Sequence, residues 1–321
     1  MRDHGGNLDW AIGHYGGSAA DWIDLSTGVN RVPYPVPAVS PEAWTALPTR
    51  SAMDGLLRAA RTAYRTKAPI VALAGAQAAI QLVPRLSAPG RARVLSPTYN
   101  EHAASLRAAG WQVEEVTRLA DLEGTDLAIV VNPNNPDGQT HTPDALLSLV
   151  GRVGRLVVDE SFGDITPALS LAPMAGREGL VVLRSFGKFY GLAGLRLGFA
   201  LGAPGEIAAM EAMSGPWPIS GAAIEVGTLA LADAAWADAT AQRLAAEAWD
   251  MDALARGHGW QPIGGTDLFR LYDTTDATAA QAHLARHQIW SRLFPYSPRW
   301  LRLGLPGAAP EWARLATALE G

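Results

Sequence analysis

Between residues 69 and 201, short apolar runs alternate with segments of helical pattern. Residues 70–74, 127–131 and 180–183 are apolar at every position, without the alternating polar positions of a half-exposed strand. Strands of this kind are buried on both faces, and helices between successive strands favour parallel pairing. We therefore predict an α/β fold with a mostly parallel sheet. Ligands bind such sheets beyond the carboxyl ends of the strands.

The pattern also divides the chain into parts. Residues 1–32 are rich in Gly, Trp and Asp without clear periodicity, and we expect them to form an N-terminal arm that lies on another surface. Residues 33–210 contain the alternating strands and helices of a large domain. Residues 211–321 begin with an alanine-rich stretch at 222–257, which predicts one or two helices, and continue as a smaller α+β domain.

Composition restricts the classes of function. The chain has 321 residues, of which 48% are apolar and 18% charged, as is typical of a globular protein. A net charge of −5 without a basic block argues against nucleic acid as a partner. The absence of cysteine excludes disulfides, thiolate metal sites and cysteine nucleophiles. Because no segment is typical of a signal core or a membrane span, we expect a cytoplasmic protein that has no membrane partner.

Lys188 has the surroundings that point most directly to chemistry. The only other lysine, Lys67, lies in a polar stretch typical of a solvated loop. Lys188 follows an apolar strand, is flanked by glycine, aromatic and hydroxyl residues, and has Arg196 eight positions further on. A lysine with little access to solvent can lose its proton and attack a carbonyl. The alternative is a surface lysine that extends from a turn.

Other polar and aromatic residues follow other predicted strands. Asp159 comes directly after an apolar strand, where a carboxylate needs a cationic partner. Asn135 lies in a turn signal, and Tyr99 has a ring that could stack on a flat ligand. Each of these residues alone is compatible with an ordinary cap, turn or packing role.

A further group of residues is suited to a phosphate. A strand-to-helix junction at residues 75–77 can present backbone N–H groups, and Ser185 and Arg196 flank Lys188. Together with Tyr99, Asn135 and Asp159, these residues supply an amine nucleophile, an acid for a ring nitrogen, an amide for a ring oxygen, an aromatic face and a phosphate site. A pyridoxal phosphate site needs that set.

Three motifs make the chain similar to a known family. They are Asn-Pro-Asn-Asn-Pro-Asp-Gly at 132–138, Val-Asp-Glu-Ser-Phe at 158–162, and Ser…Lys…Arg at 185–196. The chain resembles the aminotransferase family of fold type I over nearly its whole length. This resemblance implies a large α/β/α domain, a smaller C-terminal α+β domain, pyridoxal 5'-phosphate as cofactor, and a homodimer.

The resemblance also implies roles for individual residues. Lys188 would carry the cofactor covalently and transfer protons, Asp159 would pair with the pyridine nitrogen, Asn135 would bond the ring hydroxyl oxygen, and Tyr99 would stack on the ring. The residues expected to bind the cofactor through its phosphate are Gly75, Ala76, Gln77, Ser185 and Arg196. Those expected to bind or enclose the substrate are His4, Ser26, Thr27, Gly28, Asn135, Arg292 and Arg302.

Within the family, one branch is the most similar. His-Gly-Gly-Asn at 4–7, the run at 188–198, and Phe162 resemble the threonine-phosphate decarboxylases of cobalamin synthesis. These convert L-threonine O-3-phosphate to (R)-1-aminopropan-2-ol O-2-phosphate. The alternatives are an aminotransferase of the histidinol-phosphate type and a catalytically silent protein on the same fold.

Several positions depart from the family pattern. Phe162 stands where aminotransferases usually have a tyrosine, which removes one hydrogen bond to the ring oxygen. Leu47 stands where a tyrosine often reaches the neighbouring subunit's cofactor. Asp137 replaces a common threonine and His102 a common tyrosine.

Two other classes of site are disfavoured. No Gly-x-Gly-x-x-Gly follows a predicted strand, which argues against a nicotinamide site. His283 and His287 have zinc-like spacing, but no glutamate follows His283 to complete the usual motif. We therefore expect no metal.

Overall fold

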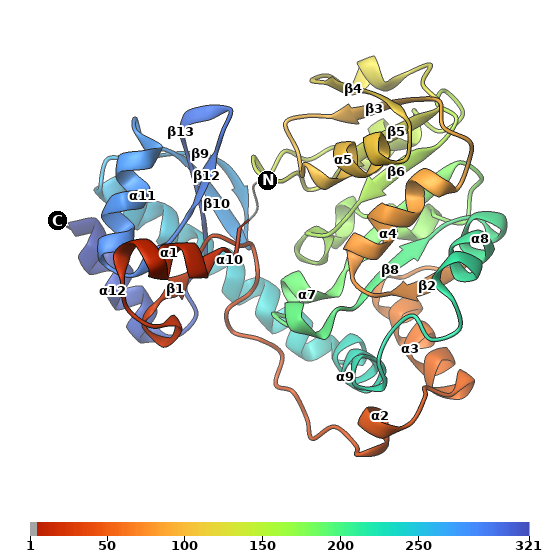
Figure 1. Ribbon diagram of the computed structural model, residues 1–321, viewed down its shortest axis with the longest axis horizontal. Helices are drawn as coiled ribbons and strands as arrows, with labels where there is room; N and C mark the ends of the chain where they lie inside the picture. The colour runs from red at the N-terminus through yellow and green to blue at the C-terminus, as the bar shows by residue number, and fades with distance from the viewer. Residues whose placement is uncertain (1–4, 321) are drawn as a thin grey trace. The chain divides into compact units, whose positions relative to one another are not determined.

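The computed structural model describes residues 5–320, which separate into two compact units (Figure 1). The large unit comprises Tyr34–Asn135 and Gln139–Ala237. The small unit comprises the residues up to Pro33, the short segment Pro136–Gly138, and the chain from Asp238 onward. The domain boundaries that we placed from the sequence, after residues 32 and 210, stay a prediction.

A seven-stranded sheet forms the centre of the large unit, in the order β2-β8-β7-β6-β5-β3-β4. All neighbouring strands are parallel except β8, which is antiparallel to both β2 and β7. The mostly parallel α/β fold predicted from the sequence is therefore confirmed. The strands are β2 (Ile70–Leu73), β3 (Arg91–Leu95), β4 (Gln112–Val116), β5 (Leu127–Val131), β6 (Leu156–Asp159), β7 (Leu180–Ser185) and β8 (Gly198–Leu201).

Helices bury both faces of this sheet. On one face, Ile80, Leu106 and Met210 pack with alternate strand residues in a single apolar core. On the other, the Tyr64 ring meets Phe199 edge-on, with ring centroids 5.7 Å apart. The helices are α2 (Glu42–Thr45), α3 (Arg50–Ala63), α4 (Ala76–Leu82), α5 (Glu101–Ala108), α6 (Pro143–Leu147), α7 (Phe186–Phe189), α8 (Pro204–Ser214) and α9 (Gly221–Ala232).

Local sequence signals explain where several of these helices begin. The side chains of Thr49, Thr142 and Ser220 each accept a hydrogen bond from a backbone N–H in the first turn of α3, α6 and α9. Such caps satisfy donors that have no partner inside the helix. The alanine-rich stretch forms two helices, since α9 ends before Asp233 and α10 (Ala234–Gly257) follows directly.

The small unit is built on an antiparallel sheet in the order β12-β13-β10-β9. A separate parallel pair, β1 with β11, joins the N-terminal segment to this unit. Its strands are β1 (Ile23–Asp24), β9 (Gln261–Thr266), β10 (Phe269–Asp273), β11 (Ile289–Trp290), β12 (Arg292–Phe294) and β13 (Ser297–Gly304). Its helices are α1 (Leu8–Tyr15), most of α10, α11 (Ala277–Arg286) and α12 (Ala309–Glu320).

Strand β4 and helix α1 are among the elements that were not predicted from the sequence. Strand β4 is polar because it is the edge strand of the large sheet, and Gln112, Glu114 and Glu115 are exposed on it. Helix α1 is short and lies in a segment without clear periodicity; only its Ala11 is fully buried. Among residues 5–320, no helix combines the length and the apolar character needed to cross a membrane.

Candidate active site

The large sheet brings most of the predicted cofactor residues to one edge. Asp159 is the last residue of β6 and Ser185 the last of β7, while Asn135, Tyr99 and Gly75 follow β5, β3 and β2. Since these strands run in the same direction, their carboxyl ends lie at the same edge of the sheet. The structure therefore assembles residues that are far apart in the sequence, as expected for ligand sites in such sheets.

Asp159 is a buried carboxylate whose two oxygens both have hydrogen-bond partners. It is 2% exposed. Its Oδ2 lies 2.8 Å from His102 Nε2, and its Oδ1 accepts hydrogen bonds from the Ser161 backbone N at 2.9 Å and the Ser161 Oγ at 2.5 Å. Burial alone raises the pKa of Asp159, but the bonds from His102 and Ser161 outweigh it, and the pKa lies below its ordinary value. The carboxylate is thus held charged and in one orientation.

His102 and Ser161 both contact Asp159, and the sequence reasoning included neither in the candidate site. We treated His102 only as a departure from a common tyrosine, although it lies one helical turn after Tyr99, beyond the same strand end. Its ring is 2% exposed and meets Tyr99 edge-on. Ser161 lies two residues after Asp159, a spacing at which an aspartate side chain commonly bonds the following backbone. Both signals were present in the sequence.

Lys188 lies in the one-turn helix α7, directly after β7. The turn is tight, because a side chain at Gly187 would place its Cβ 2.6 Å from Ala193 Cα. Lys188 is half-buried, and its Nζ lies 5.9 Å from the centre of the buried Phe162 ring. The amine therefore borders an apolar aromatic side chain where the family usually has a tyrosine.

The expected phosphate residues meet at the start of α4. Gly75 has φ +80°, and a Cβ there would lie 2.7 Å from Arg196 Nη2, so the guanidinium occupies the space beside this glycine. Gly198 also packs against this junction, since a Cβ on it would overlap the Ala76 backbone N. Strand β8 runs antiparallel to β2 and begins at the edge where β2 ends, which brings Gly198 beside Ala76.

Gln77 and Tyr99 are linked to each other. Tyr99 Oη donates a hydrogen bond of 3.3 Å to Gln77 Oε1, and Gln77 Nε2 donates one of 3.1 Å to Glu101. The Gln77 side chain thus positions the Tyr99 ring, and its backbone N–H is the group that would face a phosphate.

Arg292 and Arg302 form the principal basic feature of the small unit. They are directly opposite each other on β12 and β13. Their guanidinium carbons lie 5.6 and 5.9 Å from the centre of the same ring, that of Phe294. Burial and, secondarily, the charge of Arg292 lower the pKa of Arg302 to about 9. Burial therefore makes the charge of Arg302 costly in this position.

The Ser26 turn lies against the same arginine. Arg302 Nη2 donates a hydrogen bond of 2.7 Å to the Ser26 carbonyl, and the Gly6 backbone N donates one of 2.7 Å to Ser26 Oγ. A Cβ at Gly5 would overlap the Ser26 carbonyl, so this glycine is required by the close approach. Within the small unit, Ser26 and Arg302 are brought together as expected, with Thr27 and Gly28 in the same turn. His4 lies outside the described residues.

The large-unit residues fit pyridoxal phosphate by their chemistry. The buried Asp159 is an anion suited to a protonated ring nitrogen, and Lys188 is an amine beside an aromatic surface. Gly75 leaves room for Arg196 at the start of α4, where a cation and backbone N–H groups suit a phosphate. Residues at a single sheet edge thus include an amine, an acid, the Asn135 amide, an aromatic face and a cation beside a helix start, which are groups that this cofactor needs.

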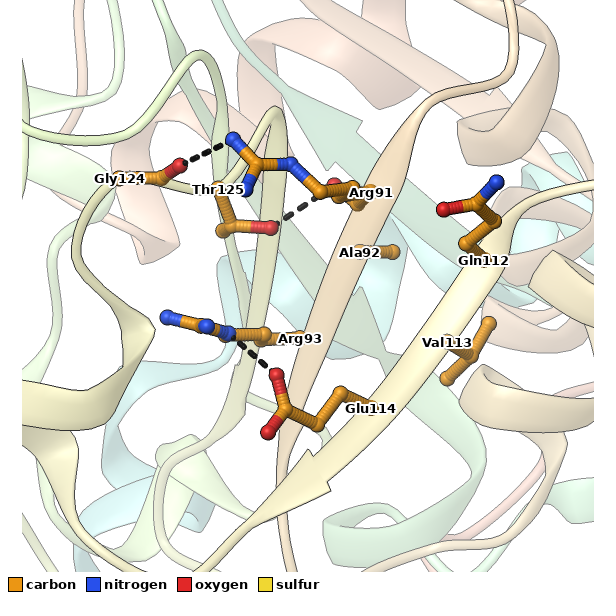
Figure 2. Close-up of a pocket in the computed structure, with 8 residues that line it drawn as sticks. All are labelled: Arg91, Ala92, Arg93, Gln112, Val113, Glu114, Gly124 and Thr125. Carbon is orange, nitrogen blue, oxygen red and sulfur yellow. Dashed lines mark hydrogen bonds and ion pairs between the residues drawn. The ribbon is translucent and has the colours of Figure 1, made fainter.

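A hollow elsewhere in the large unit has a different character. A cavity of about 380 Å³ lies over β3, β4 and the loop at Gly124 (Figure 2). Both of its arginines already have partners: Arg91 bonds the Gly124 carbonyl, and Arg93 pairs with Glu114 at 2.7 Å. These cations fix the loop to the sheet, and neither lies at the carboxyl end of its strand.

Comparison with known proteins adds independent findings. A model of the family described as aminotransferase class I and II matches residues 21–319. Curated threonine-phosphate decarboxylases of Pseudomonas aeruginosa and a Sinorhizobium species are 44% and 42% identical, covering 100% and 98% of this chain and 98% and 97% of theirs. A solved histidinol-phosphate aminotransferase of Sinorhizobium meliloti, in complex with pyridoxal-5'-phosphate, has a TM-score of 0.79 at 20% identity, covering 97% of this chain and 93% of that one.

Proposed function

The chain belongs to the class I and II aminotransferase family, and from that premise we propose that it is a pyridoxal phosphate-dependent threonine-phosphate decarboxylase. Its substrate would be L-threonine O-3-phosphate and its product (R)-1-aminopropan-2-ol O-2-phosphate, for the side chain of cobalamin. Identity above 40% to two such enzymes over nearly the whole chain supports this choice over a histidinol-phosphate aminotransferase.

The observation that carries the proposal is the arginine pair of the small unit. A substrate with both a carboxylate and a phosphate presents two anionic groups. Arg292 and Arg302 offer two guanidinium groups beside one ring, and Arg302 is 6% exposed. Guanidinium binds both carboxylate and phosphate in bidentate geometry, and burial strengthens each bond. The pair is therefore suited to a doubly anionic amino acid.

The reaction divides the work among named residues. When bound, pyridoxal phosphate supplies an electron sink for the bond that breaks at the substrate Cα. Lys188 would hold the cofactor and, once displaced by the substrate amine, return a proton to Cα. Asp159, kept charged by His102 and Ser161, would hold a proton on the ring nitrogen. The arginine pair would orient the substrate so that its carboxylate leaves perpendicular to the ring.

Two lysines in the chain allow a matched test. Lys188→Ala should abolish carbon dioxide release from threonine phosphate and remove the hydride-trapped adduct from its peptide. Lys67→Ala, which changes an exposed lysine, should leave both unchanged. Amino transfer to a keto acid from histidinol phosphate, without carbon dioxide release from threonine phosphate, would instead favour the aminotransferase. Cofactor binding without turnover of either substrate would favour the silent protein.

We also propose that the protein is a cytoplasmic homodimer. Support for the dimer comes from exposed apolar side chains of the large unit on and beside α2 and α9. Trp44, Leu47 and Leu229 are 69%, 65% and 50% exposed, and α2 packs closely on the start of α9 at Gly221. Exposed apolar side chains that gather on neighbouring elements are typical of surfaces that another subunit covers. Sedimentation would give the mass of a dimer.

A further inference from the structure

The chain passes between its two units on either side of a three-residue segment. Asn135 belongs to the large unit, Pro136–Gly138 to the small unit, and Gln139 to the large unit again. The residue expected to bond the cofactor's ring oxygen is therefore the direct neighbour of a segment that the small unit holds.

One backbone hydrogen bond holds this segment to β9. The Gly265 N donates to the Asp137 carbonyl over 2.9 Å. Strand β9 is the edge of the small sheet, and an edge strand has backbone groups that its own sheet does not pair. The segment at Asp137 thus caps part of this edge.

Glycines permit the close approach on both sides. A Cβ at Gly264 would overlap the Asp137 carbonyl, and a Cβ at Gly138 would overlap the Gly265 carbonyl. Gly138 also has φ +71°, which other residues rarely adopt. The contact is therefore backbone against backbone, with no space for a side chain between them.

The residue on the other side of Asn135 is fixed within the large unit. The Asn134 N donates to the Gln139 carbonyl at 2.8 Å, its Oδ1 accepts from Thr98 Oγ1 at 2.6 Å, and its Nδ2 donates to the Pro97 carbonyl at 2.9 Å. Asn135 consequently has one neighbour anchored to the loop after β3 and its other side anchored, through Asp137, to β9. Its backbone has little freedom of its own.

We propose that the contact of Asp137 and Gly138 with Gly264 and Gly265 is a positioning contact for Asn135. The inference rests on the proposed function, because it takes Asn135 to bond the ring oxygen of pyridoxal phosphate. Displacing the segment from β9 moves the backbone next to Asn135 and weakens that bond. A hydrogen bond to the deprotonated ring oxygen lowers the pH at which the bound cofactor's absorbance titrates, so losing the bond raises this pH.

Gly264→Ala tests the contact with the smallest change, because Gly264 does not need a left-handed backbone. In the Gly264→Ala holoenzyme, the pH midpoint of the cofactor's absorbance titration should rise. This rise should be at least half of the rise that Asn135→Ala causes. Exchange of the Gly265 amide should accelerate at least tenfold. Gly257→Ala is the matched control in the same unit: a Cβ there meets nothing within 4 Å, and both readouts should stay at wild-type values.

The outcomes separate this inference from the proposed function. A wild-type midpoint in a folded Gly264→Ala holoenzyme would overturn the positioning role, as would fast exchange of the Gly265 amide in the wild type. Failure of the wild-type protein to bind pyridoxal phosphate would overturn the proposed function instead, while the exchange measurement would still report on the contact. If Gly264→Ala fails to fold, Gly138→Ala compared with Gly151→Ala gives the same test, because both glycines have positive φ and only Gly138 is in close contact.

Discussion

Two buried arginines, one in each unit, have opposite electrostatic surroundings. Arg184 in the large unit is 3% exposed and Arg302 in the small unit is 6% exposed. Arg184 donates to Glu160 at 2.9 Å and to Asp164 at 2.5 Å, and it lies over the Tyr64 ring. Burial alone lowers the pKa of Arg184, but the two carboxylates reverse this effect and raise it. For Arg302, burial and a second arginine lower the pKa to about 9.

The difference separates a charge that the fold balances from a charge that we propose binds the substrate. Glu160 and Asp164 balance the charge of Arg184 within the fold. Burial disfavours the charge of Arg302, so a bound anion would stabilise the protonated guanidinium. The substitutions below compare these two arginines and then extend the comparison to Asp159.

The largest effect on stability is expected from Arg184→Met. The substitution leaves Glu160 and Asp164 buried without their shared cation, and burial already raises the pKa of both carboxyls. Removal of one partner from a buried ion pair costs about 3–5 kcal/mol of unfolding free energy. Denaturant unfolding would measure this loss. Arg302→Met should change the unfolding free energy by less than about 1.5 kcal/mol. Equal losses in the two variants would contradict the distinction between the two arginines.

The largest effect on catalysis is expected from Arg302→Met. Because we propose that this buried cation binds a substrate anion, its loss should reduce kcat/KM for threonine phosphate by about 100-fold, or about 3 kcal/mol. The matched control is Arg299→Met on the same strand, where an exposed arginine pairs with Asp273 at 2.9 Å. An exposed pair contributes little, and kcat/KM should stay within about twofold of the wild type. Similar losses of kcat/KM in both variants would contradict a role for Arg302 in substrate binding.

A smaller effect is expected from pH. Below about pH 9, Arg302 is protonated in both the folded and unfolded states, and its unfavourable burial is fully present. Above that pH the folded state releases the proton first, so the unfolded state binds more protons and the unfolding free energy rises. At pH 10 the wild type should gain about 1 kcal/mol relative to Arg302→Met. Parallel stability curves for the two proteins from pH 8 to pH 10 would contradict this expectation.

The smallest effect is expected from Ser161→Ala. Asp159 is another buried charge, balanced by hydrogen-bond donors, and this variant removes the Oγ donor at 2.5 Å. The unfolding free energy should fall by about 1 kcal/mol at pH 7. The lowered pKa of the Asp159 carboxyl stabilises the folded state at pH values above the unfolded-state pKa. The difference in unfolding free energy between the wild type and Ser161→Ala should therefore disappear as the pH falls below about 4. The exposed Ser148→Ala is the control, and a difference that persisted in acid would rule out an effect through Asp159.

Hydrophobic periodicity and the residues at strand ends were enough to predict most of the fold and part of the candidate site. The apolar runs at 127–131 and 180–183 predicted β5 and β7, and with them a sheet edge that carries Asp159 and Ser185. Strand β4 was missed because an edge strand with exposed polar residues lacks an apolar run. The position of His102 beyond the end of β3 could be read from the sequence, but its contact with Asp159 joins residues 57 positions apart and was not predicted. The opposition of Arg292 and Arg302 depends on the register of β12 with β13, which their spacing in the sequence does not determine.

The reversed direction of β8 limits where the chain can be altered. Because β7 and β8 are neighbours of opposite direction, the segment from 186 to 197 turns back without crossing the sheet and keeps Lys188 and Arg196 at one rim. Insertions in this segment would separate the amine from the guanidinium, and a new chain end opened there would release both. The segment between β4 and β5 returns from the edge of the sheet and carries neither group, so it is the safer place for a fusion or a circular permutation.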